Sequence, residues 1–368
     1  MANDDLRAAN KAKKDEFYTS YEDIQLEMNN YDELFREKTV LCNCDDPFES
    51  NFCKFFLKNF NYLGLKRLIC TSYVNSPIIG TQMTIFDYLD EPVQRGHGYV
   101  MDISEVPMAN GRGVSDDDIE KLLKSKKRGV KKLEGDGDFR SEECINYLKQ
   151  ADIVVTNPPF SMFREYVALL VEYDKDFLII GNTNSLTYKE IFRLFKEDRI
   201  RTGYTKFNVG MFFEVPDYYE KYTKIVDGKK LARVSTSCWF TSLPVKKHND
   251  FLICYKKYSD EEYRSYANFE AINVNKYTDI PQDYSGLMGV PVTFLDKYNP
   301  EQFELIGLGI SNSGIEIGVK PYTEEHKKYR KNVQHKGAVD GDLYMLDEDG
   351  HPDVPYARII IRRKEKKS

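Results

Sequence analysis

The chain lacks any long apolar run. None of its 368 residues belongs to a stretch approaching the roughly 18 consecutive apolar residues that a membrane-spanning helix needs. Residues 1–16 also lack the apolar middle that is typical of a signal peptide. The sequence therefore predicts a cytoplasmic protein that has no membrane partner.

Cysteine is scarce and irregularly spaced. The chain has seven cysteines, an odd number that fits reduced thiols in the cytoplasm. Cys42, Cys44 and Cys53 lie close together, but no fourth ligand follows at a usable spacing and no histidine is near. We interpret these side chains as small buried hydrophobic groups, and we predict no metal site.

An excess of basic residues is also missing, because the formal net charge is −6. This balance excludes a uniformly basic coat for nucleic acid. Three basic stretches nevertheless stand out at 124–132, 327–336 and 358–368. Each alone is as well explained as a solvated face, but together they favour a polarised surface that follows phosphates.

Apolar runs typical of buried strands alternate with segments of helical spacing, which predicts an α/β fold with a mostly parallel sheet and helices on both faces. The expected strands are 39–44, 66–73, 152–156 and 176–182. The expected helices are 50–60, the end of 133–151 with Ser141 as its cap, 161–173 and 188–198.

The length of the chain exceeds what a single core usually fills, so we expect a large domain and a smaller one. We place the large domain at 1–265, with a loop-rich insertion at 74–115, and a smaller α+β lobe at 266–368. Short apolar runs within 211–255, namely 211–215, 238–243 and 251–255, suggest an antiparallel hairpin at the edge of the sheet.

A rigid turn follows the expected strand 152–156: Asn157-Pro158-Pro159-Phe160. Ligands of open α/β sheets bind beyond the carboxyl ends of the strands. The prolines remove two N–H donors, so the turn offers mainly acceptors. The Asn157 side-chain oxygen and the Pro158 carbonyl suit both hydrogens of a planar amino group, and Phe160 offers a face for stacking. The alternative is a stiffened loop, and the turn alone leaves the amino substrate open.

Six segments in order resemble the EcoRI-methylase family of adenine-specific DNA methyltransferases. They are KKDEFYTSYEDI, VLCNCDDPFESNFCKFFLKNF, GDGDFRSEECI, ADIVVTNPPFSMFREYVALL, FLIIGNTNSLTYKEIF and GVPVTFLDKYNPEQFELIG. The resemblance implies a Rossmann-like sheet and transfer of a methyl group from S-adenosylmethionine to the 6-amino group of a flipped adenine in double-stranded DNA. It implies no metal, and it implies a modification enzyme of a restriction-modification system or an orphan methylase. A cognate endonuclease would act on the same site without a stable complex.

The resemblance also implies site residues by position. The catalytic turn is Asn157, Pro158, Pro159 and Phe160. The residues expected to bind the cofactor are Phe17, Tyr18, Thr19, Asp45, Asp46, Pro47, Asp138 and Phe139. An alternative for the acidic turn at 45–47 is a helix cap ahead of Ser50.

The sequence departs from common methyltransferases where the cofactor ribose is held. No acidic residue closes the strand at 66–73, so Thr71 or Ser72 is left for a weak contact. The lobe at 266–368 would read the DNA sequence, with loops around 311–314 and 327–336. Trp239, the only tryptophan, is better explained as a core residue than as a neighbour of the flipped base.

Two other functions compete with this hypothesis. A methyltransferase acting on RNA or on a protein glutamine amide would use the same turn, since an amide nitrogen poses the same chemical problem. A DNA-binding module without turnover would keep the fold but not the chemistry. The intact turn at 157–160 favours an enzyme.

Overall fold

The computed structural model describes residues 18–45, 50–73, 98–107, 114–115, 118–119, 122, 130–207, 209–215 and 219–365. Three residues expected at the cofactor site, Phe17, Asp46 and Pro47, lie outside the described residues, as does most of the stretch 74–115. The chain forms two compact units. The first combines Met1–Thr183 with Gly203–Leu243, and the second combines Asn184–Thr202 with Pro244–Ser368.

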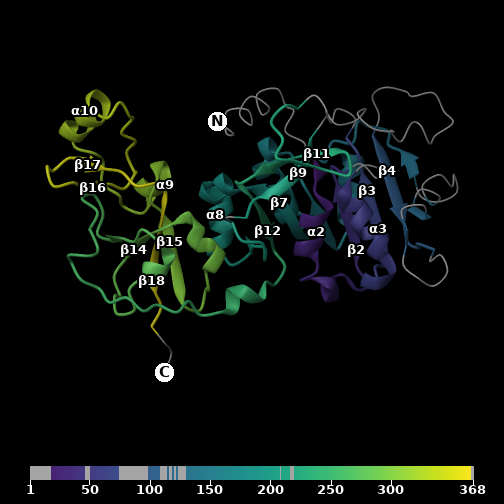
Figure 1. The fold of residues 1–368 in the computed structure, drawn as a ribbon, viewed down its shortest axis with the longest axis horizontal. Helices are drawn as coiled ribbons and strands as arrows, with labels where there is room; N and C mark the ends of the chain where they lie inside the picture. Colours follow the sequence, from purple (N-terminus) through teal and green to yellow (C-terminus); the bar gives the residue numbers. More distant parts are fainter. Residues whose placement is uncertain are drawn as a thin grey trace. The chain divides into compact units, whose positions relative to one another are not determined.

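The main sheet of the first unit runs in the order β5-β4-β3-β2-β6-β7-β12 (Figure 1). Its strands are β2 (Thr39–Asn43), β3 (Arg67–Thr71), β4 (Tyr99–Ile103), β5 (Val130–Lys132), β6 (Ile153–Thr156), β7 (Asp176–Asn182) and β12 (Ser237–Thr241). The pairs β2/β3, β2/β6 and β6/β7 are parallel, whereas β3/β4, β4/β5 and β7/β12 are antiparallel. The fold is therefore mixed α/β, and the prediction of a mostly parallel sheet holds only at its centre.

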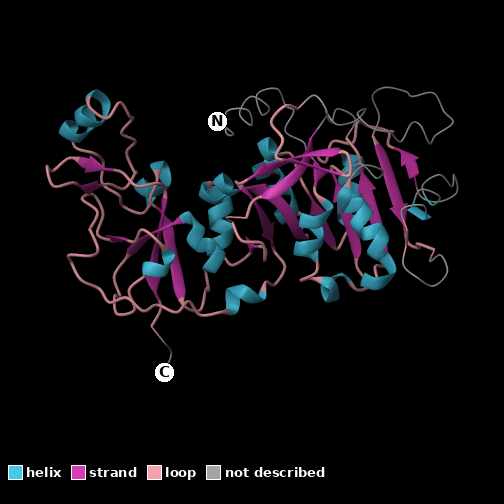
Figure 2. Ribbon diagram, viewed as in Figure 1, coloured by secondary structure: helices cyan, strands magenta, loops and turns pink. Residues whose placement is uncertain are grey.

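Helices cover both faces of the centre of this sheet (Figure 2). Cys42 on β2 is in register with Cys70 on β3, and Cys70 is bonded to Cys53 on α3 (Asn51–Leu63). The next residue of β2, Asn43, contacts Tyr166 on α7 (Phe163–Glu172). Successive side chains of a strand point to opposite faces, so α3 and α7 lie on opposite sides.

Local sequence signals explain where the helices begin and end. Ser50 caps α3 by accepting a hydrogen bond from the Phe52 N–H, and Gly64 ends it with a left-handed φ of 63°. Ser141 caps α6 (Glu142–Gln150) in the same way, as predicted. Ser20 caps α2 (Tyr21–Met28), which is followed by the short helix η1 (Asp32–Phe35).

The first unit contains a second, smaller sheet in the order β1-β9-β11-β10. Its strands are β1 (Tyr18–Thr19), β9 (Met211–Val215), β10 (Lys224–Val226) and β11 (Lys229–Val234). The predicted hairpin of 211–215, 238–243 and 251–255 is therefore wrong. β12 is buried along its whole length and belongs to the main sheet, whereas β9 alternates between buried and half-buried residues.

The second unit has its own sheet, in the order β13-β14-β18-β15, around a core that includes Tyr266, Leu343 and Ile360. The strands of this sheet are β13 (Ile272–Asn273), β14 (Met288–Pro291), β15 (Phe303–Leu308) and β18 (Arg358–Arg363). Outside it, the second unit has β8 (Arg201–Thr202) and the antiparallel pair of β16 (Met345–Leu346) and β17 (Pro352–Asp353). Its helices are α8 (Lys189–Lys196), α9 (Ser311–Glu316) and α10 (Glu324–Asn332), with the short turns η3 (Thr183–Thr187), η4 (Lys246–Asn249), η5 (Tyr277–Asp279) and η6 (Val292–Lys297).

Part of the basic C-terminal stretch is not a surface cluster. Ile359, Ile360 and Ile361 are fully buried in β18, which pairs with strands on both sides. Arg362 forms an ion pair with Glu304 at 2.6 Å. The isoleucines between the arginines place this segment in the core, and the stretch contributes less free positive charge than its composition suggested. None of the helices in the described part of the chain combines the length and the apolar character needed to span a bilayer.

Candidate active site

The Asn157–Phe160 turn leaves the carboxyl end of β6 in the middle of the main sheet. Pro158 and Pro159 are buried, while Asn157 and Phe160 are half-buried. The Pro159 carbonyl accepts a hydrogen bond from the Met162 N–H at 2.9 Å, which starts the short helix η2 (Phe160–Met162) that leads into α7. The turn is thus held from both sides, by the sheet before it and by the helix after it.

The ring of Phe160 meets the edge of Phe213 on β9, with 6.3 Å between ring centroids and an interplanar angle of 90°. Phe213 is in register with Thr19 on β1. The structure therefore brings together two segments that were expected to act together, the Tyr18–Thr19 segment and the catalytic turn. Phe213 was not singled out from the sequence, because nothing local distinguishes it from other core aromatics.

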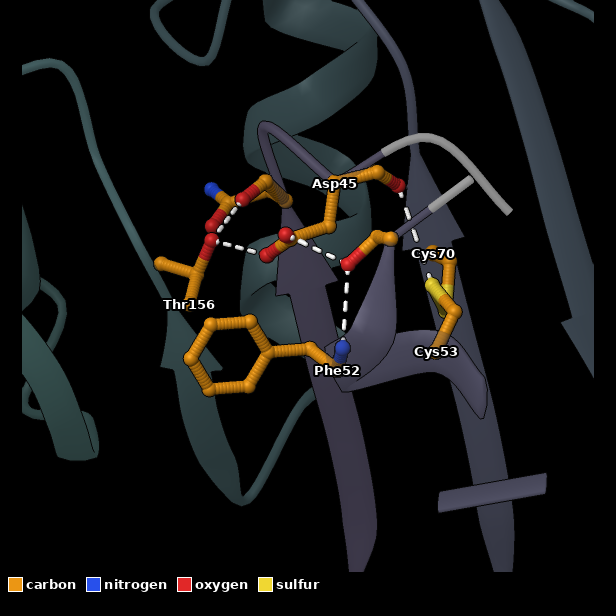
Figure 3. The surroundings of a disulfide bond; sticks show 7 residues. Asp45, Phe52, Cys53, Cys70 and Thr156 are labelled. Carbon is orange, nitrogen blue, oxygen red and sulfur yellow. Dashed lines mark hydrogen bonds between the residues drawn. A yellow bond between two sulfur atoms is a disulfide. The ribbon is translucent and has the colours of Figure 1, made fainter. Parts of the chain in front are cut away.

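The third expected segment, the acidic corner after β2, meets the same end of the sheet (Figure 3). The carboxylate of Asp45 is buried and accepts a hydrogen bond from the Ser50 hydroxyl at 2.7 Å. The Thr156 hydroxyl, directly before the catalytic turn, contacts the same carboxylate and the Asn43 carbonyl. Asp45 therefore joins the ends of β2 and β6 to the start of α3. The N-cap of this helix is Ser50 itself, and Asp45 accepts from the capping hydroxyl instead of capping the helix.

Asn51, the first residue of α3, links the corner to the smaller sheet. Its buried side-chain amide donates to the Thr19 carbonyl and to the Glu214 carboxylate, both at 2.8 Å. Glu214 on β9 also pairs with Lys229 at 2.6 Å. Asn51 was missed from the sequence, although a polar residue opening an otherwise apolar helix is a usable signal.

Two buried threonine hydroxyls at this end of the first unit have no hydrogen-bond partner in the part of the chain that the structure describes. They are the Oγ1 atoms of Thr19, which is 2% exposed, and Thr71, which is 1% exposed. An unsatisfied buried hydroxyl costs about 1–3 kcal/mol, so such groups point to a bound polar group. Thr71 ends β3 and is in register with Asn43, next to the Asp45 corner.

Ser72, the alternative to Thr71, is already engaged. Its hydroxyl accepts a hydrogen bond from the Tyr99 N–H at 3.0 Å. Its carbonyl lies so close to Gly137, which has a φ of 84°, that a Cβ at Gly137 would collide with it. The glycine-flanked loop before α6 is thereby packed on the end of β3.

Asp138 and Phe139 follow this glycine. Asp138 forms an ion pair with Arg140 at 2.7 Å, and hydrogen bonding from the Arg140 side chain lowers the pKa of the Asp138 carboxyl below its usual value. Phe139 is 5% exposed and meets Tyr166 edge to face at 5.0 Å. Tyr166 in turn donates to the Asn43 side chain, and burial raises the pKa of its phenol.

A disulfide joins Cys53 on α3 to Cys70 on β3 beneath the Asp45 corner (Figure 3). The prediction that all cysteines are reduced thiols is therefore wrong for this pair. Cys42, Cys44, Cys144, Cys238 and Cys254 are not disulfide-bonded. Trp239 is 0% exposed and packs edge to face on Phe52, which confirms its interpretation as a core residue.

Comparison with known proteins gives this arrangement a class. The family described as adenine-specific methyltransferase EcoRI matches residues 5–364. The chain is 42% identical over 365 residues, 98% of its length and 96% of the relative, to the Type II methyltransferase M.EcoRI of Escherichia coli. It is 38% identical over 306 residues to the Type II methyltransferases M.MgeORF184P of Mycoplasma genitalium and M.MpnI of Mycoplasma pneumoniae, covering 81% of this chain and 84% and 83% of theirs. No solved structure matches it significantly.

These relatives define the class: the protein is a site-specific DNA methyltransferase with specificity for adenine. The chain belongs to the family of EcoRI adenine-specific methyltransferases. The family implies S-adenosylmethionine as the methyl donor. The resemblance expected from the sequence is confirmed over nearly the whole chain.

Proposed function

We propose that this protein transfers a methyl group from S-adenosylmethionine to the exocyclic 6-amino group of an adenine flipped out of double-stranded DNA. The convergence of three segments at one end of β2 and β6 carries the proposal. The catalytic turn meets β1 through Phe213, and it meets the Asp45 corner through Thr156. The carboxyl ends of parallel strands are where α/β sheets of the Rossmann type bind their ligands.

The residues at this corner fit the methyl donor. The unsatisfied hydroxyls of Thr19 and Thr71 are available to polar groups of the methionine end and the ribose. The Asp45 carboxylate supplies a negative charge that suits an ammonium group. Asp138 and Phe139 suit the hydrogen bonds and the apolar face of an adenine ring, and Tyr18 closes over the methionine end. When bound, the donor supplies an electrophilic methyl group on sulfonium, which needs no metal.

The Asn157–Phe160 turn would hold the acceptor. An adenine amino group has two N–H donors, and the Asn157 Oδ1 atom and the Pro158 carbonyl are acceptors on a backbone that Pro158 and Pro159 make rigid. Hydrogen bonds to both hydrogens strengthen as positive charge develops on the nitrogen, so they favour the transition state. Phe160 supplies a face on which the flipped base stacks, worth roughly 1–3 kcal/mol.

The C-terminal part of the chain would read the DNA sequence. This target-recognition role is proposed for residues 266–368, which form most of the second unit, and the catalytic role for residues 1–265. The protein would act as the modification enzyme of a restriction-modification system or as an orphan methylase. A cognate endonuclease would cut the same site without forming a stable complex with it.

Methyl transfer to different acceptors tests the proposal. The protein is incubated with labelled S-adenosylmethionine and duplex DNA, RNA or a mixture of proteins, with and without a chelator. We expect label only on duplex DNA, in the form of 6-methyladenine, and at the same rate with the chelator present. Label on RNA or on protein glutamine, or chelator-sensitive activity restored by a metal, would overturn the corresponding part of the proposal.

A further inference from the structure

The second unit contains a polar pocket of about 310 Å³ that no expected loop of the recognition lobe accounts for. Its lining comes from the segment around β13 and from the segment that runs from β17 to the start of β18, together with Met345 of β16. Seven of its lining side chains are polar or aromatic and carry the argument: Glu262, Arg264, Asn273, Asn275, Asp353, Tyr356 and Arg358. Surface pockets with a few convergent polar groups are where proteins recognise ligands.

The floor of this pocket is a buried arginine. Arg358, the first residue of β18, is 7% exposed, and none of the described carboxylates forms an ion pair with it. Its Nε donates to the Asn273 Oδ1 at 3.1 Å, and its Nη1 donates to the Tyr356 carbonyl at 3.2 Å. A buried cation balanced only by neutral groups is expensive, and an acceptor placed in the pocket would offset part of that cost.

The buried arginine orients the exposed side chains at the mouth of the pocket, which we call the rim. Asn273, held by Arg358 and by the Tyr266 hydroxyl at 2.8 Å, donates from its amide nitrogen to the Asn275 Oδ1 at 2.9 Å. This bond leaves the Asn275 amide nitrogen as the outward donor of an exposed side chain. The rim is therefore preorganised by hydrogen bonds that begin at the buried Arg358.

Two further rim side chains complete the pocket. The guanidinium of Arg264 is fixed by the Asp353 carboxylate at 2.8 Å and by the Leu346 carbonyl at 2.7 Å, while its side chain stays 47% exposed. Tyr356 is 94% exposed, an unusual state for a tyrosine in a structured segment. An exposed aromatic ring beside fixed donors is an arrangement suited to planar groups.

The charges of the lining favour base edges over phosphate. The exposed guanidinium of the pocket, that of Arg264, is already paired with Asp353, and Glu262 is paired with Lys256 at 2.5 Å, so the rim offers N–H donors instead of an unpaired positive charge to attract a phosphate. Guanidinium, amide and carboxylate groups are, in contrast, the side chains that read the donor and acceptor pattern of base edges in the major groove.

We infer that this pocket is a sequence-reading surface of the recognition lobe, in which Arg264 and Asn275 contact base edges, Tyr356 packs against the DNA, and Arg358 with Asn273 holds them in position. The inference rests on the proposed function, because it takes duplex DNA as the substrate. It adds the residues that decide which DNA sequence is methylated.

Methylation of a panel of duplexes tests this assignment. The target site is first identified by sequencing methylated DNA from cells that express the protein, and then every single base-pair change in that site is made. We expect Arg264→Gln and Asn275→Ala each to lower kcat/KM on the intact site about 10- to 100-fold and to relax discrimination at one base pair. Arg193→Gln, an exposed arginine of α8 outside the pocket, removes the same charge and should change neither property.

The possible outcomes distinguish a failure of the pocket assignment from a failure of the proposed function. Equal weakening on all sequences, with a binding slope against salt that falls by about one, would mark a phosphate contact and overturn the assignment. Wild-type sequence preference in both rim variants would overturn it as well. A wild-type protein that methylates no duplex at all would instead overturn the proposed function. Because Arg264 and Asn275 are exposed, their variants are expected to fold, which thermal unfolding confirms.

Discussion

The hydroxyl of Thr156 at the end of β6 contacts the carboxylate of Asp45 at the end of β2. This contact joins the residue before the catalytic turn to the corner where the methyl donor is expected. Both side chains are buried, and the two residues are 111 positions apart in the chain. In the proposed site, the relative placement of the methyl donor and the acceptor base would therefore depend on a contact inside the protein.

Replacement of Thr156 by valine is expected to lower the free energy of unfolding by about 1–3 kcal/mol, because the buried Asp45 carboxylate loses a hydrogen-bond donor. Urea denaturation measures the change. Thr71→Val is the matched control, because it removes a hydroxyl of the same sheet that has no hydrogen-bond partner among the described residues. A Thr156→Val variant as stable as the control would contradict the structural role of the contact.

Thr71→Val is expected to act on cofactor binding instead of stability. If its hydroxyl holds a polar group of the methyl donor, the Kd for S-adenosylmethionine should rise about 2- to 10-fold, the value of one hydrogen bond. Calorimetric titration with the donor measures this. Ser72→Ala should show the reverse, a loss of about 1 kcal/mol of stability with the Kd unchanged, since Ser72 is bonded to Tyr99. An unchanged Kd in Thr71→Val would remove Thr71 from the site.

Asn157→Ala is expected to lower kcat about 100- to 1000-fold, because it removes an acceptor whose hydrogen bond strengthens in the transition state. Binding of the methyl donor and of DNA should stay within a few-fold of the wild type. Single-turnover kinetics and DNA binding assays measure the two effects. Asn30→Ala, an exposed asparagine after α2, is the control. Wild-type turnover in Asn157→Ala would refute the catalytic assignment of the turn.

The second unit should lose stability at mildly acidic pH because of His248. Burial lowers the pKa of this imidazole below its ordinary value of 6.5, and the neighbouring Lys247 and Arg201 lower it further, against hydrogen bonds to the Tyr298 and Thr202 carbonyls. At a pH below 6.5 the imidazole is therefore protonated in the unfolded chain but not in the folded chain. The free energy of unfolding keeps its full value above the ordinary pKa and falls as the pH drops below it.

The measurement is urea denaturation at pH 7.5 and pH 5.5. We expect the loss of stability between these two conditions to be smaller in His248→Gln than in the wild type, because the glutamine does not titrate. The glutamine variant will also be less stable at both pH values, as it keeps only part of the hydrogen bonding. An identical pH dependence in the two proteins would show that His248 does not contribute.

Much of the first unit could be predicted from the sequence. The elements β2, α3, β3, α6, β6, α7 and β7 lie where the apolar periodicity, the capping serines and the terminal glycine predict them, whereas β5 was not predicted. These signals are local, since a capping serine or a left-handed glycine acts within one turn of the chain. The order of the family segments was equally informative, because it identified the class before any contact was known.

Pairing between distant segments was not predictable in the same way. The sequence suggested that 211–215 and 238–243 form one hairpin, but β9 pairs with β1 and β12 pairs with β7. Similarly, the basic residues near the C-terminus suggested an exposed segment, but Ile359, Ile360 and Ile361 among them form a buried strand. Which strand lies beside which depends on burial of both faces by the whole fold, and short apolar runs do not encode it.

The sequence by itself determined the class of enzyme and the turn proposed to carry its chemistry, because rigid prolines and an asparagine amide act through their own covalent structure. Only the tertiary structure decided that Asn51, Phe213 and Thr156 hold this turn to the expected donor site, that Thr71 instead of Ser72 has an unused hydroxyl, and that Arg358 lies beneath a polar pocket. These contacts join residues that are far apart in the sequence. They contribute to stability and to binding only after folding has removed the contacting groups from water.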